Sequence, residues 1–192
     1  MNLIIRPEQR KKTSLNFIAL IPDRELRIKA NAIKKDFKRF ESSKATNVYT
    51  HITLKAPFKV SGIDRDSLLS WFYKIRLQQT PFHVYLNGFA AFHNKYNPVI
   101  YINPMPNREL IKMQRELMID FHNILPAKVH PIDRSFKPHM TVAYRDLTPE
   151  NFARAWKEYK DKHFYDVFDV HSIYLLEHDW QSWNIIATHK PG

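Results

Sequence analysis

The chain contains no cysteine and only three glycines among its 192 residues. Without cysteine it has no disulfide bonds, no thiolate nucleophile and no cysteine zinc site. The glycines stand far apart, at positions 62, 88 and 192, so neither a Walker-type loop nor a dinucleotide-binding fingerprint can be written from them. The sequence therefore excludes glycine-rich phosphate loops and thiol chemistry.

Long hydrophobic runs are also missing. The opening run Leu3–Ile5 is cut short by Arg6 and Pro7, so the first thirty residues hold no apolar core of a signal peptide. No run elsewhere approaches the length of a membrane span. We therefore expect a cytoplasmic protein that does not associate with membranes.

What is present is a packed, basic chain. Hydrophobic residues make up 44% and aromatic residues 14% of the composition, which is typical of a globular protein with one core or two lobes sharing an interface. The net charge of +11 favours polyanionic partners such as RNA. Part of this charge has an ordinary explanation, because Lys34, Lys35, Lys38 and Arg39 are expected on the solvated face of a helix.

Two short strings carry the chemistry: His51-Ile-Thr53 and His139-Met-Thr141. Both lie in segments that alternate apolar and polar residues, as half-buried strands do. Side chains two residues apart on a strand point to the same face, so each string presents an imidazole and a hydroxyl to one target. The alternative is that these are surface or core histidines of a sheet, each with a threonine nearby and without a catalytic role.

The hydrophobic pattern predicts strands and helices throughout the chain. The strands are expected at 14–21, 47–58, 82–92, 98–102, from 138 onward, 167–177 and 183–189; the helices are expected at 23–41, 64–79, 107–125 and 148–159. The order strand, helix, His-Thr strand, helix, strand recurs in both halves. It predicts a pseudo-twofold α+β fold in which two lobes each contribute one His-Thr strand to a shared cleft.

At these strands the chain resembles the two-histidine phosphoesterase superfamily, also called 2′-5′ RNA ligase-like. The matching strings are His51–Phe58 and Phe136–Ala143, with further similarity at Asn97–Ile102 and at Ile173–Leu176 followed by Trp183. The resemblance spans nearly the whole length. It implies a single bilobal domain over residues 1–192, with two antiparallel sheets flanked by helices and a central water-filled cleft.

The resemblance also implies metal-free chemistry on cyclic phosphates or 2′–5′ linkages of RNA and nucleotides, without a cofactor. Many members have an arginine three positions after the second threonine, where this chain has Tyr144, with Arg145 one residue later. Either Arg145 takes that role through a local bulge, or the substrate contacts differ. We expect a monomer.

Our hypothesis is that His51 and His139 act as the acid–base pair and that Thr53 and Thr141 hold the phosphate. Imidazole suits this role because its unperturbed pKa of about 6.5 lies near neutral pH. Lys55 and Arg145 share the faces of the two motifs and are candidate substrate-binding residues. A metal site is disfavoured, because neither motif has a carboxylate or second histidine at ligand spacing.

Three functions follow from the sequence. The first is a phosphodiesterase that hydrolyses 2′,3′-cyclic phosphate ends of RNA or nucleotides, or related small cyclic phosphates. The second is the reverse reaction, 2′-5′ RNA ligation. The third is a basic RNA-binding module without catalysis. Phe58, Phe92 and Trp183 could stack on a base, although core packing is the commoner fate of such residues.

Overall fold

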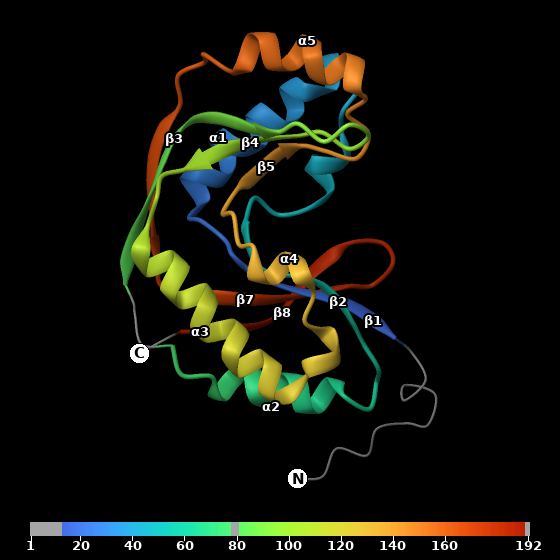
Figure 1. Ribbon diagram of the computed structural model, residues 1–192, viewed down its shortest axis with the longest axis vertical. Coiled ribbons are helices and arrows are strands. Elements are labelled where there is room, and N and C mark those ends of the chain that lie inside the picture. Colours follow the sequence, from blue (N-terminus) through green and yellow to red (C-terminus); the bar gives the residue numbers. More distant parts are fainter. Residues whose placement is uncertain (1–12, 78–80, 191–192) are drawn as a thin grey trace.

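The structure, a computed structural model, describes residues 13–77 and 81–190. Within this part of the chain, two antiparallel four-stranded sheets form two lobes that are flanked by helices (Figure 1). This confirms the predicted α+β, two-sheet fold class. Among the described residues, no helix has the length and apolarity needed to cross a membrane.

The first sheet has the strand order β2-β1-β7-β8. Its strands are β2 (Ile52–Val60), β1 (Ser14–Leu20), β7 (Ile173–His178) and β8 (Trp183–His189). The helices α2 (Arg65–Lys74), α3 (Arg108–Ile124) and α4 (Pro131–Arg134) pack on this lobe, α2 against β8, and α3 and α4 against β2.

The second sheet has the strand order β5-β4-β3-β6. Its strands are β5 (Met140–Ala143), β4 (Val99–Pro104), β3 (Phe82–Phe92) and β6 (Tyr165–Val170). The helices α1 (Arg24–Asp36) and α5 (Pro149–Tyr159) cover this lobe. Thus β2 and β5, the strands that follow the two histidines, are both edge strands, and they contact one another.

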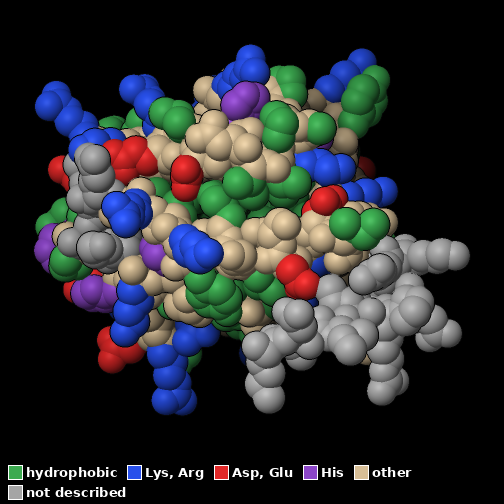
Figure 2. All heavy atoms as spheres, turned by 90° about the horizontal axis from the view of Figure 1, so that it is seen from below, with side chains coloured by type: hydrophobic (Ala, Val, Ile, Leu, Met, Phe, Trp, Pro, Cys, Tyr) green, Lys and Arg blue, Asp and Glu red, His purple; other side chains and the backbone are tan. Residues whose placement is uncertain are grey.

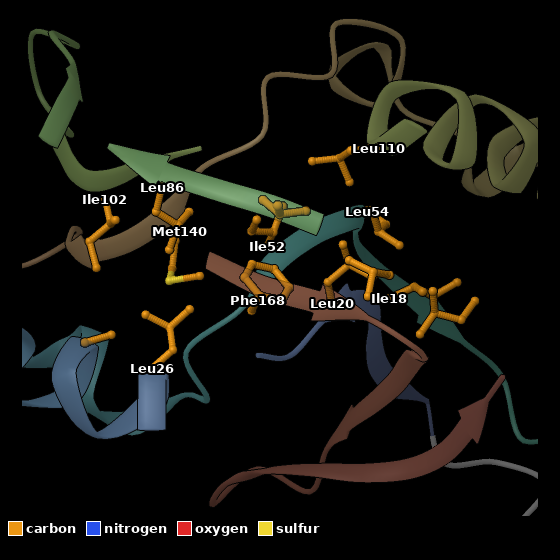
Figure 3. Close-up of a cluster of buried hydrophobic side chains, with 14 of the residues drawn as sticks. Ile18, Leu20, Leu26, Ile52, Leu54, Leu86, Ile102, Leu110, Met140 and Phe168 are labelled. Atoms are coloured by element: carbon orange, nitrogen blue, oxygen red, sulfur yellow. The ribbon is translucent and has the colours of Figure 1, made fainter. Parts of the chain in front are cut away.

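One hydrophobic core joins the two lobes. Ile18 and Ile52 of the first sheet belong to the same buried cluster as Ile102 and Met140 of the second. Leu26 of α1 lies among them (Figure 3). Because α1 follows β1 in sequence but packs on the other sheet, the chain crosses between the lobes early, which holds their facing edges at a fixed separation.

Three helices begin with a side-chain cap. The side chains of Asp23, Asn107 and Thr148 accept hydrogen bonds from backbone N–H groups three residues later, at 2.9, 2.7 and 3.2 Å. Each such cap contributes about 1 kcal/mol by satisfying an N–H that has no partner within the helix.

Several predicted elements differ from the structure. The strand expected at 47–58 begins only at Ile52, because Lys44–Asn47 forms a 3-10 helix and His51 stands just before β2. The single strand expected at 167–177 is two strands in different sheets, because the chain leaves the second sheet at His171 and Ser172 and enters the first. The predicted helix 23–41 ends as an α-helix at Asp36 and continues as a 3-10 helix, Phe37–Phe40. The last two residues of the predicted helix 64–79 lie outside the described residues, and α2 ends earlier, at Lys74.

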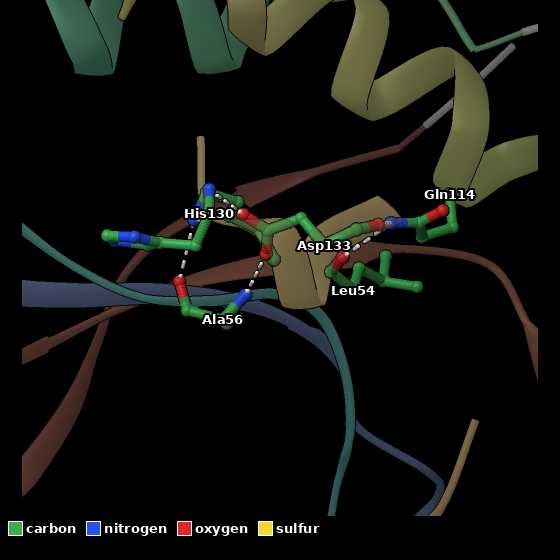
Figure 4. A network of polar contacts seen from close by, with 6 residues as sticks. Leu54, Ala56, Gln114, His130 and Asp133 are labelled. Atoms are coloured by element: carbon green, nitrogen blue, oxygen red, sulfur yellow. Dashed lines mark hydrogen bonds and ion pairs between the residues drawn. The ribbon is translucent and has the colours of Figure 1, made fainter. Parts of the chain in front are cut away.

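A buried ion pair ties β2 to α4. Lys55 Nζ lies 3.0 Å from Asp133 Oδ2, and both side chains are almost fully buried. Asp133 also accepts hydrogen bonds from the backbone N–H groups of His130 and Ala56, at 2.7 and 3.2 Å (Figure 4). Gln114 of α3 donates to the carbonyls of Leu54 and Asp133. The network therefore fixes the segment 130–134 between β2 and α3.

We expect Asp133→Asn to lower the free energy of unfolding by about 3–5 kcal/mol, because it leaves the Lys55 ammonium buried without a counter-charge. Adding Lys55→Met should restore part of the loss, since no buried charge then remains. Urea denaturation of the two variants measures both effects. A single variant that loses less than about 1 kcal/mol would contradict the structural role of this pair.

Candidate active site

The two His-Thr motifs meet in one pocket. Each histidine stands one residue before an edge strand, His51 before β2 and His139 before β5. A pocket of about 320 Å³ is lined by both histidines and both threonines. Residues 88 positions apart in sequence, and on different sheets, thus share one cavity.

Both imidazole rings are oriented by the same backbone contact. Nδ1 of His51 lies 2.6 Å from the carbonyl oxygen of Tyr49, and Nδ1 of His139 lies 2.7 Å from that of Lys137. A carbonyl oxygen only accepts hydrogen bonds, so each Nδ1 carries the proton and donates it. In the neutral ring, Nε2 is then the unprotonated nitrogen, available as a base or, once protonated, as an acid.

Aromatic side chains pack against both rings. The His51 ring lies 4.9 Å from that of Phe17, which also contacts Trp183 at 4.5 Å. The His139 ring lies 5.0 Å from that of Phe92. These contacts and the carbonyl bonds restrict rotation of the imidazoles, so their free nitrogens are held in place before a substrate arrives.

Burial keeps both histidines neutral. The pKa of His51 is lowered to about 4, mainly by desolvation. The hydrogen bond to Tyr49 opposes this shift, and the neighbouring positive charges of Lys34 and protonated His139 add to it. Burial also lowers the pKa of His139, and Lys34 does not act on it. The two rings are therefore close enough to influence each other, and their environments differ.

Lys34 supports the wall of the pocket from behind, through Val48, and does not line the pocket itself. It was expected on the solvated face of its helix, but its side chain is only 1% exposed. Its Nζ donates to the carbonyl oxygen of Val48 at 3.0 Å, and it forms no ion pair among residues 13–77 and 81–190. Burial lowers the pKa of Lys34 to about 8. The sequence contains a pattern that predicts this burial, because Lys34 follows the buried Leu26 and Ala30 at four-residue spacing.

The threonine hydroxyls are free to bind a ligand. Thr53 and Thr141 are half-buried and line the pocket. Within the part of the chain that the structure describes, neither hydroxyl forms a hydrogen bond with the protein. Both can therefore donate to an oxygen atom in the cavity.

Arg145 lies at the pocket together with Tyr144. It has a left-handed backbone with φ of 61°, and the N–H of Asp146 donates to the carbonyl of Tyr144 at 2.8 Å, which closes a three-residue turn around Arg145. The Asp146 carboxylate accepts hydrogen bonds from Ser42 Oγ and the Ser43 N–H, at 2.9 and 2.8 Å. The turn brings Arg145 to the pocket wall beside the Tyr144 ring, whose centroid lies 5.1 Å from its guanidinium carbon.

Lys55 does not lie at the pocket, contrary to the expectation that it binds substrate. Thr53 pairs with Ala19 and Lys55 with Ile18, so β2 carries one more residue than β1 at this point, a β-bulge. The bulge interrupts the alternation that would place Lys55 on the face of Thr53. The Lys55 side chain is instead fully buried against Asp133.

The site offers no cluster of metal ligands. Among the described residues, no group of three or more His, Cys, Asp or Glu side chains is placed to hold a metal ion. Acid–base groups and hydrogen-bond donors are the chemistry that the pocket contains. A pocket with two imidazoles, two free hydroxyls and a guanidinium is suited to a phosphate, whose oxygens accept hydrogen bonds and carry negative charge.

Known proteins are similar to this chain in sequence and in fold. The 2′-5′ RNA ligase superfamily matches residues 22–181. Relatives from Geobacillus kaustophilus ("Putative phosphoesterase GK0864") and Bacillus pumilus are 28% and 27% identical over 91% and 89% of this chain and 95% and 94% of their own lengths.

Two solved structures have the same fold at lower sequence identity. TT0787 of Thermus thermophilus and Escherichia coli LigT complexed with 3′-AMP both align with a TM-score of 0.66, at 16% and 18% identity. They cover 92% and 94% of this chain, and the alignments span 97% and 99% of theirs.

The fold and pocket thus define a two-histidine phosphoesterase architecture. The chain belongs to the 2′-5′ RNA ligase superfamily, which places it among enzymes of the phosphoesterase kind.

We expect inorganic phosphate to raise the pKa of both active-site histidines. An anion beside an imidazolium stabilises the charged form and offsets the desolvation that lowers the pKa of the free rings. Imidazole NMR resonances followed over a pH series, with and without phosphate, measure the change. Titration of His51 near pH 6.5 in the free protein, unmoved by phosphate, would refute this account of the pocket.

Lys34→Met should raise the pKa of His51, because it removes a positive charge that disfavours the imidazolium. The same NMR titration measures the rise, and the pKa of His139 serves as the internal reference because Lys34 does not act on it. Equal changes at both rings would point to a general opening of the pocket instead of a lost charge.

Proposed function

We propose that this protein is a metal-independent phosphodiesterase that hydrolyses 2′,3′-cyclic phosphate ends of RNA or nucleotides to 2′-phosphates. The observation that carries the proposal is the pair of imidazoles in one pocket, each with Nδ1 bonded to a backbone carbonyl and Nε2 left free. Hydrolysis of a cyclic phosphate needs one base and one acid near the same phosphorus atom, and this pair supplies both.

In the proposed reaction, water attacks phosphorus in line with the bond to the 3′ oxygen. Nε2 of one histidine takes a proton from the water while the other histidine gives a proton to the departing 3′ oxygen. The P–O3′ bond breaks, and the products are a 2′-phosphate and a free 3′ hydroxyl. Proton exchange with solvent then restores both rings.

The two environments favour different roles for the histidines. Lys34 lies against the segment that leads into His51 and disfavours protonation of that ring, so we assign His51 as the base for the attacking water. His139 is free of this influence and is assigned as the acid. The negative charge of the bound phosphate would keep His139 protonated before the reaction.

The remaining pocket groups would stabilise charge on the phosphate. The hydroxyls of Thr53 and Thr141 have no protein partner among the described residues and are assigned to the non-bridging oxygens, where charge grows in the transition state. Arg145 is assigned to the same phosphate, and Lys55 is not, because it is buried away from the pocket.

The second candidate is the reverse reaction, because the superfamily to which the chain belongs is named for 2′-5′ RNA ligation. Ligation would join a 2′,3′-cyclic phosphate end to a 5′ hydroxyl through a 2′–5′ bond, with the histidines exchanging roles. Incubation of one RNA with a cyclic phosphate end and another with a 5′ hydroxyl end distinguishes hydrolysis from ligation by the length of the product.

We expect His51→Ala and His139→Ala each to lower turnover of a 2′,3′-cyclic nucleotide by about 10²–10⁴-fold in the presence of a chelator. His163→Ala, at an exposed histidine outside the pocket, is the matched control and should retain activity. Product analysis should show only the 2′-phosphate. Activity that the chelator abolishes would overturn the metal-free mechanism, and salt-sensitive RNA binding without any turnover would favour the RNA-binding module.

A further inference from the structure

Two further cavities lie in succession beside the active-site pocket. A cavity of about 450 Å³ shares Thr53, Pro57 and His139 with it. A third cavity has a volume of about 660 Å³. It shares Gln114, Asp133 and the residues 135–137 with the second cavity. We call these three adjoining cavities, which lie from the histidine pair to the C-terminal half of α3, the α3 groove.

The walls of the α3 groove are fixed in the absence of a ligand. One wall is α3, through Gln114, Arg115 and Met118, and the other is the segment 129–137. The buried Asp133 holds that segment through Lys55 and two backbone N–H groups. The groove is therefore preformed, which lowers the entropy lost when a ligand binds.

The α3 groove is positively charged. Arg115, Arg134 and Lys137 line it with exposed side chains, and none of them forms an ion pair among the described residues. Asp133 is the only acidic residue among the described residues that line the two outer cavities, and Lys55 neutralises it. On the face that Figure 2 views, basic side chains are scattered among acidic and hydrophobic ones.

Flat apolar surface accompanies the charges. Phe136 lines both outer cavities and is half-buried, and Phe92 lines the cavity next to the active site. Aromatic rings beside a cationic track are the combination that binds single-stranded nucleic acid, because bases stack on the rings while phosphates meet the cations.

We infer that the α3 groove binds the RNA strand that lies 5′ of the reacting end, with phosphates at Arg115, Arg134 and Lys137 and a base on Phe136. This inference rests on the proposed function and narrows its substrate to oligonucleotides that carry a 2′,3′-cyclic phosphate. The active-site pocket of about 320 Å³ is at the small end of ligand sites, and the two outer cavities supply room for further nucleotides.

The test compares a 2′,3′-cyclic mononucleotide with an RNA of about five nucleotides ending in the same cyclic phosphate. We expect the wild-type protein to have a kcat/KM at least about tenfold higher for the oligonucleotide, since cations and stacking add binding energy only there. Arg115→Gln/Arg134→Gln should remove most of this preference and leave the mononucleotide within about twofold. The salt slope for the oligonucleotide should fall by about 1.4, or about 0.7 for each lost phosphate contact.

Lys35→Gln/Lys38→Gln is the matched control, because it removes the same charge from exposed positions that do not line the groove. It should retain the oligonucleotide preference. Equal kcat/KM for the two substrates in the wild type, or equal losses in the two double variants, would overturn the inference while leaving cyclic phosphate hydrolysis intact.

Absence of turnover for both substrates would count against the proposed function instead. Fluorescence anisotropy with the same oligonucleotide then decides on the groove alone. Weaker, less salt-sensitive binding in Arg115→Gln/Arg134→Gln than in the control supports the groove, and unchanged binding overturns it.

Discussion

The site depends on one repeated constraint, the hydrogen bond from each histidine's Nδ1 to the backbone carbonyl two residues earlier. The bonds at His51 and His139 differ by only 0.1 Å in length. Each fixes both the tautomer and the direction of its ring, so the reactive nitrogen is decided by backbone geometry alone. Because each histidine precedes an edge strand, the contact between β2 and β5 brings the two fixed rings into one pocket.

Partial burial lowers the pKa of both rings, and the burial of charge beside them reduces the stability of the fold. Burial that makes His51 neutral also leaves Lys34 with a single carbonyl partner and a pKa near 8. A charged group buried without a counter-ion weakens the fold, because desolvation disfavours it. The same lysine, however, places a positive charge beside one histidine and not the other. An otherwise symmetric pair thereby becomes unequal, as a reaction that needs one acid and one base requires.

Local patterns could predict most of the fold and the centre of the site. Strand alternation places His51 and Thr53 on one face, and similar halves indicate two lobes. Contacts between residues that are distant in sequence could not be predicted from such local patterns. The bulge that turns Lys55 inward arises from pairing between β1 and β2, and the partner Asp133 lies 78 residues away from Lys55. The burial of Lys34, by contrast, could have been predicted from the sequence, because the helical spacing places it on the same face as Leu26 and Ala30.

Arg145 reaches the pocket through a tight turn that follows β5, which ends at Ala143. A non-glycine residue with φ of 61° is strained, so the turn at Arg145 persists only because its surroundings hold it. Asp146 supplies that restraint, because its carboxylate accepts hydrogen bonds from the hydroxyl of Ser42 and the backbone N–H of Ser43. The turn thereby brings the Arg145 guanidinium to the wall of the pocket that holds the two histidines.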